Sequence, residues 1–285
     1  MPLARFVAVS VCRMMIVSTA AAVAGLALLA TGPAIAQTGA AHDLAPYVAT
    51  YELTFGRHGR SAVSGGRARM TVEITGGRCT QYKLVRTMSG TLNGDHGAMS
   101  ISSENVITEN AAGTQLAVSI TERANGKITR QETAIARRDA DGTINVRSTR
   151  LGANPVALPQ KALLPMAQER MVVRALAAGR PNLSVAVYNP ELGLTAIDRI
   201  AYTIAPAVTT PVDKSHPAAL PSLRNVSRHP ITMTMSNAKT GKTRVIEKQI
   251  RFVNNVFSVA DSTVLDSMTI KARMLSLKML PPPCP

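Results

Sequence analysis

Most of the chain after residue 36 alternates between apolar and polar positions in short runs that end at turn residues. Residues 47–55 and 66–75 show this alternation or nearly so, which is typical of strands with one buried face. Residues 116–122 and 127–136 also have the pattern of strands. Asn125-Gly126 separates the last two runs and is a strong hairpin signal. About a dozen runs of this kind, mostly linked by hairpin turns, predict an antiparallel sheet.

One long segment, residues 163–179, follows the period of a helix instead. Pro165 is tolerated in a first helical turn, and Gly179 followed by Pro181 is a stop signal. The segment is apolar around most of its circumference, which is typical of a buried helix. A single helix in a β-rich chain needs a sheet to cover it, so we expect a curved antiparallel sheet wrapped around this helix.

The helix is predicted to present two different sides. Its core face is predicted to consist of Leu164, Met171, Val172 and Ala175. Arg170 and Arg174 lie four residues apart and form a narrow cationic stripe. We expect these two arginines to reach solvent or a rim, where they form a candidate binding surface.

Residues 1–36 have the pattern of a secretory signal peptide. Arg5 and Arg13 supply positive charge, residues 14–30 are largely apolar, and Ala34-Ile35-Ala36 is a small-x-small cleavage site. An uncleaved membrane anchor is the alternative. No later run approaches the roughly 20 apolar residues of a transmembrane helix. We therefore expect residues 37–285 to form a single exported domain without a transmembrane span.

The charge of the chain limits its partners. The sequence carries 32 Lys and Arg against 17 Asp and Glu, a formal net charge of +15, and the basic residues are scattered. Five tyrosines, four phenylalanines and no tryptophan provide little for stacking on bases, so nucleic-acid binding is not expected. Attraction to an anionic lipid or an envelope polymer suits an exported protein of this charge better.

The cysteines predict a covalent link. Cys12 leaves with the signal peptide, so Cys79 and Cys284 are the two thiols of the mature chain. Two thiols in an exported protein usually oxidise to one bridge, although two free thiols or an intermolecular bridge remain alternatives. An intramolecular bridge would close a long loop and stabilise the fold by roughly 5 kcal/mol in the chain-entropy account.

No motif in the chain indicates catalysis, a cofactor or a metal site. The nucleophile elbow, the zinc-protease helix motif and both glycine-rich nucleotide loops are absent from the sequence. The five histidines show no ligand spacing, and Met233 and Met235 suit core packing better than copper ligation. We predict that the protein is not an enzyme, although a triad assembled from distant residues remains an alternative.

Four segments resemble a known family. Residues 44–55 (LAPYVATYELTF), 66–84 (GRARMTVEITGGRCTQYKL), 165–179 and 268–284 (MTIKARMLSLKMLPPPC) are similar, in the same order, to the cell envelope integrity protein EipB family of exported α-proteobacterial proteins. The resemblance implies a periplasmic β-spiral, an open curved antiparallel barrel around a central helix. It also implies a disulfide between Cys79 and Cys284. The chain departs from the family at Gln168-Glu169 and at residues 205–228 and 257–261.

Two functions of different classes follow. The first is a non-catalytic periplasmic protein that supports envelope integrity by binding a protein partner or an envelope component. The second is a lipid or lipoprotein carrier whose concave face holds acyl chains; an enzyme of unknown class is third. A carrier needs an empty apolar cavity, whereas a helix that fills the barrel favours the first function. The sequence does not predict the ligand, the partner or the oligomeric state.

Overall fold

The computed structural model describes residues 43–152, 154–158, 162–208 and 210–283, which form one sheet around one α-helix. The predicted signal peptide lies outside the described residues. The strands are β1 (Tyr47–Arg57), β2 (Val63–Gly76), β3 (Gln81–Gly94), β4 (Gly97–Asn110), β5 (Gln115–Ala124), β6 (Lys127–Arg138), β7 (Ile144–Arg147), β8 (Val156–Leu158), β9 (Asn182–Tyr188), β10 (Ile197–Ile204), β11 (Arg228–Asn237), β12 (Thr243–Phe252), β13 (Phe257–Val264) and β14 (Met268–Met279). The helices are α2 (Pro165–Ala177) and the short 3-10 helix η1 (Pro221–Leu223).

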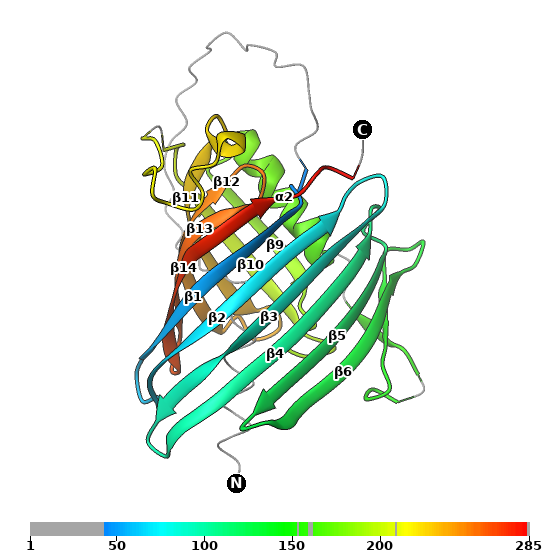
Figure 1. Ribbon diagram of the computed structural model, residues 1–285. Coiled ribbons are helices and arrows are strands. Elements are labelled where there is room, and N and C mark those ends of the chain that lie inside the picture. The colour runs from blue at the N-terminus through cyan, green and yellow to red at the C-terminus, as the bar shows by residue number, and fades with distance from the viewer. Residues whose placement is uncertain (1–42, 153, 159–161, 209, 284–285) are drawn as a thin grey trace.

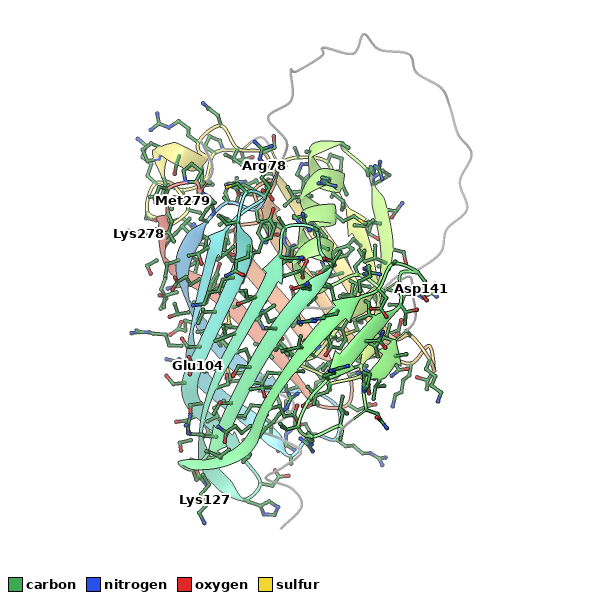
Figure 2. All side chains as sticks on the ribbon, turned by 90° about the vertical axis from the view of Figure 1, so that its right-hand side faces the viewer. Arg78, Glu104, Lys127, Asp141, Lys278 and Met279 are labelled. Atoms are coloured by element: carbon green, nitrogen blue, oxygen red, sulfur yellow. The ribbon has the colours of Figure 1, made fainter. Side chains whose placement is uncertain are left out.

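The fourteen strands form one curved open sheet, as the alternation predicts. Their order is β8-β7-β6-β5-β4-β3-β2-β1-β14-β13-β12-β11-β10-β9, and every neighbouring pair is antiparallel. The first and last strands therefore lie side by side in the middle of the sheet. Figure 1 shows β1–β6 as the near wall, β9–β13 behind them, and α2 between the two walls. Figure 2 shows Arg78 at one end of this barrel and Lys127 at the other.

The ends of α2 are fixed by backbone groups that find partners outside a regular helix. Leu164 at the N-cap provides no side-chain hydrogen bond to the first turn. Instead the Glu109 carboxylate of β4 accepts the backbone N–H groups of Met166 and Ala167, each at 2.8 Å. At the other end Gly179 adopts φ +61°, which suits glycine after a helix, and the helix ends at Ala177.

The helix packs against both walls of the barrel. Val172, Ala175 and Leu176 form a cluster with side chains of β9–β11, including Ile200, Tyr202 and Met233. Leu164, Met166 and Val173 belong to the main core, which is formed largely by β1–β7 and β12–β14. Among the described residues, no helix has the length and apolar character needed to cross a membrane.

Two residues of the helix differ from the expectation. Met171 was placed on the core face but is only half-buried, whereas the polar residues Gln168 and Glu169 are buried. The Arg170 side chain is only 15% exposed, while Arg174 is exposed. Arg170 is buried because it has partners there, as its Nη1 donates to the Ala111 carbonyl oxygen at 2.7 Å and its guanidinium lies 4.9 Å from the Tyr82 ring centre. A paired arginine can be buried where an unpaired one could not.

Candidate functional site

The two ends of the curved sheet meet at a junction that is not a regular strand pair. β6 pairs with β7 only over Ile135–Arg138, so residues 127–134 have no strand partner on that side within the described part of the chain. The loop of residues 189–196, between β9 and β10, lies at this position, and its Asn189 and Glu191 are buried. We call this junction of β6 with residues 189–196 the seam.

Arg130 of β6 connects the two sides of the seam. Its Nη1 donates to the backbone oxygen of Glu191 at 2.7 Å, and its Nη2 donates to the backbone oxygen of Pro190 at 3.0 Å. Nearby, Leu163 exchanges backbone hydrogen bonds with Ala186 and Tyr188 of β9, at 2.7 and 2.8 Å. Within the described residues, the sheet is therefore closed here by side-chain contacts such as those of Arg130 and by the backbone pairing of Leu163, and no ladder of strand hydrogen bonds joins β6 to β9.

Arg86 of β3 holds the same loop from across the interior. Its Nη1 donates to both carboxylate oxygens of Glu191, at 2.8 and 2.9 Å, and both side chains are buried. Asn105 of β4 donates to the same carboxylate at 3.1 Å. Buried charges are tolerated when they are paired and hydrogen-bonded in this way.

The carboxylates around Arg130 complete the charge balance on the inner face. Arg130 lies 3.2 Å from Glu122 and 2.6 Å from Glu132, and Arg150 also contacts Glu132. Burial by itself would raise the pKa of Glu132, but the hydrogen bond and charge of Arg130, together with Arg150, lower the pKa below its ordinary value. Glu132 therefore stays ionised and keeps Arg130 in place.

A second group of buried charges lies beside the helix. Arg251 of β12 donates to Glu169 of α2 at 2.6 Å and also contacts Gln249 and Asn255. On the same strand, Glu247 accepts a hydrogen bond from the Ser262 hydroxyl at 2.6 Å. Burial raises the pKa of Glu247 to about 7, against the opposing effects of Ser262 and Arg251. These contacts tie the helix to the far wall.

The carboxyl group of Glu109, at the start of α2, is also harder to ionise than an exposed one. Burial raises its pKa to about 7, although the two backbone N–H groups that it accepts favour the charged form. No group of three or more His, Cys, Asp or Glu residues suited to a metal ion occurs among the described residues. The arrangement of these buried groups neutralises charge and positions elements of the barrel.

The structure places the sequence-predicted residues as follows. Leu164, Val172 and Ala175 are buried against the two walls. Cys79 Sγ lies 3.4 Å from the backbone oxygen of Pro283, the residue before Cys284. Cys284 itself lies outside the described residues, so the disulfide stays a prediction.

Sequence reasoning missed the buried charges, although a signal for them exists. Arg86 lies in phase with the inward positions Leu84 and Met88 of β3, and Glu122 lies in phase with Ile120 and Ala124 of β5. A charged residue at an inward position of an alternating strand indicates a buried pair. The alternation does not identify the partner, because that partner lies on another part of the fold.

The comparisons with known proteins agree with this architecture. A family model described as EipB-like matches residues 38–281. Among the solved structures, the chain is similar to the crystal structure of a beta-barrel-like protein of a domain of unknown function from Brucella abortus. The two share 16% identity and a TM-score of 0.76, over 84% of this chain and 99% of that chain. A search of curated proteins found no match.

Proposed function

The chain belongs to the EipB-like family, and from this membership we propose that it is a non-catalytic periplasmic protein that supports the integrity of the cell envelope. In this role it binds a protein partner or a component of the envelope. Export by residues 1–36 places it in the periplasm. The excess of basic residues favours a partner that is anionic, such as a lipid headgroup, an envelope polymer or an acidic protein surface.

The observation that carries this proposal is the position of α2. Val172 and Val173 are both 0% exposed, and they pack toward different walls of the barrel. Side chains of the helix therefore occupy interior space that a carrier of acyl chains on the concave face would need to leave open. The ion pairs of Arg86 and Arg251 further tie the interior together across the barrel. Such a scaffold favours recognition on its outer surfaces and loops.

Deletion of the gene and complementation test the proposed role. We expect the deletion strain to be more sensitive to detergents and to antibiotics that act on the cell wall. The full chain should restore resistance, and a version without residues 2–36 should fail because it is not exported. An unaffected deletion strain, or rescue by the version without residues 2–36, would contradict the proposal.

Native mass spectrometry of protein purified from the periplasm distinguishes the alternative function. A carrier should retain acyl chains inside the barrel, and this retention should persist when loops on the outer face are altered. Protein that carries no lipid in its interior is expected from the proposal.

A further inference from the structure

The segment between β10 and β11 forms a flap at one end of the barrel, beside β11 and β12 (Figure 1). Residues 205–208 and 210–227 make this flap, which contains η1 and appears in yellow beside β11 and β12 in Figure 1. Its base is fixed by a bridge between Val208 and Arg228 and by a hydrogen bond from the Val253 N–H to the Ser227 oxygen at 2.9 Å.

The flap covers an aromatic side chain on the outer face of the sheet. Strand alternation places Phe252, at the end of β12, on the face opposite the inward side chain of Arg251. Phe252 is nevertheless only 1% exposed. Its strand partner on β11 is Arg228, so an apolar side chain and a cation lie next to each other under the flap.

A cavity of about 510 Å³ lies between the flap and the paired residues Arg228 of β11 and Phe252 of β12. Its size falls within the range of small-molecule binding sites. The walls combine apolar and cationic side chains, chiefly Val212, Leu223, Phe252, Lys214, Arg224 and Arg228. No salt bridge among the described residues involves any of these three cations.

The other titratable groups of the flap do not neutralise the cavity. Asp213 is the sole acidic residue of the flap sequence; its carboxylate accepts the Ser215 N–H and hydroxyl at 2.8 and 2.7 Å, and Asp213 does not line the cavity. His216 Nδ1 accepts the Ala218 N–H at 3.0 Å, and burial together with the charge of Arg228 lowers its pKa. Lys214, Arg224 and Arg228 therefore give the cavity a net positive charge.

We propose that the flap cavity binds an anionic phospholipid. The phosphate is held by Lys214, Arg224 and Arg228, and the start of an acyl chain lies against the half-buried Val212 and Val226. Free phosphate would leave this apolar part of the cavity empty, and a lipid with a zwitterionic head would compensate the three cations less well. The inference rests on the proposed function and deepens it, because it names the envelope component.

Titration calorimetry with short-chain lipids below their micelle concentration tests the proposal. Dihexanoyl phosphatidylglycerol should bind the mature protein at one site. Dihexanoyl phosphatidylcholine and inorganic phosphate should each bind at least about tenfold more weakly. The choline lipid lacks the net negative charge, and inorganic phosphate lacks the acyl chains. Equal affinity for the choline lipid or for inorganic phosphate would overturn the proposal.

Two double variants separate the cavity from the general positive charge of the protein. Lys214→Gln/Arg224→Gln should weaken binding of the glycerol lipid about tenfold, and both side chains are exposed, so folding should be unaffected. Lys239→Gln/Lys242→Gln removes the same charge from the exposed β11–β12 turn and should leave affinity unchanged. Equal effects of the two variants, or binding to phosphatidylglycerol vesicles without binding of the monomeric lipid, would show surface attraction only and overturn the proposal.

Complementation distinguishes failure of this inference from failure of the proposed function. We expect Lys214→Gln/Arg224→Gln to complement the deletion strain poorly and Lys239→Gln/Lys242→Gln to complement it fully. If the wild-type chain rescues the strain but binds no phosphatidylglycerol, the lipid inference is wrong and the envelope role stands. If the deletion strain has no envelope defect, the envelope role fails regardless of lipid binding.

Discussion

Arg86 donates two hydrogen bonds to the carboxylate of Glu191, at 2.8 and 2.9 Å, although 105 positions separate the two residues in the chain. Arg86 lies on β3 in one wall, and Glu191 lies in the loop that fills the seam. This pair therefore ties the loop at the seam to the inner face of β3, an interior strand of the sheet. The seam depends on side chains that are buried and charged, which makes it sensitive to single substitutions.

Arg86→Met should destabilise the protein strongly. The substitution leaves the Glu191 carboxylate buried without its cation, although Asn105 still donates to it. Breaking a buried ion pair by removing one partner typically costs about 3–5 kcal/mol. Denaturant titration of the mature protein should show this decrease in the free energy of unfolding.

The matched control is Arg57→Met. Arg57 forms an ion pair with Asp95 at the same distance of 2.8 Å, but the two side chains are 49% and 54% exposed. Loss of an exposed pair should change the free energy of unfolding by less than about 1 kcal/mol. If both variants lose equally little free energy of unfolding, the Arg86–Glu191 pair does not hold the seam.

Val172→Asp and Arg174→Ala test the faces of α2. Val172 is fully buried, so an aspartate there would be an unpaired buried charge and should unfold or severely destabilise the protein. Arg174 is exposed, and its replacement by alanine should change stability by no more than about 0.5 kcal/mol. Melting curves of both variants decide the matter, and the reverse order of effects would reverse the assigned faces.

Glu247→Gln should change how stability depends on pH. Burial raises the pKa of Glu247 from 4.5 in the unfolded chain to about 7 in the folded protein. The folded protein therefore loses stability as pH rises from 4.5 through about 7, because the carboxyl must then ionise in a buried position. Glutamine does not ionise, so the variant does not lose stability in this way. Relative to the wild type, it should therefore gain stability between pH 5 and pH 8, by an amount on the order of 3 kcal/mol.

Melting temperatures of wild type and variant at pH 5 and pH 8 measure this difference. Glu104→Gln is the control, because Glu104 is exposed on the outer side of β4. This variant controls for the removal of one carboxylate from the protein surface. A constant difference between Glu247→Gln and the wild type would show that this buried carboxyl does not titrate in the folded protein between these pH values.

The predicted disulfide can be tested by thiol labelling. Denatured, non-reduced mature protein from an oxidising compartment should contain no free cysteine, because Cys79 lies next to the chain end that carries Cys284. Two labelled thiols per chain would contradict the intramolecular bridge. Cys79→Ser should lower the free energy of unfolding by about 2–5 kcal/mol and should therefore lower the melting temperature. The far-ultraviolet circular dichroism should stay unchanged.

The intact mass of exported protein tests the cleavage site. The sequence before Gln37 predicts a mature chain that starts at that residue or within one or two positions of it. Recovery of residues 26–29 in a membrane fraction would instead support an uncleaved anchor.

Much of the fold follows from local patterns in the sequence. The alternation in residues 66–75 and 116–122 is a property of neighbouring positions, and it becomes the inward and outward faces of β2 and β5. The Asn125-Gly126 turn joins β5 to β6 as expected, and both residues have positive φ. The helix of residues 165–177 and its glycine stop are equally local. Such features depend on a few adjacent residues, so they can be read before the chain folds.

The tertiary structure alone decided which charges meet. Arg170 was expected at a rim, but Ala111 and Tyr82 provide partners that allow it to be buried. The pairing of Arg86 with Glu191 and the cavity under the flap arise between segments far apart in the sequence. Local periodicity specifies the face on which a side chain lies, whereas the curvature of the sheet determines what faces it. A buried charge is stable only where that curvature brings its counter-charge within hydrogen-bond distance.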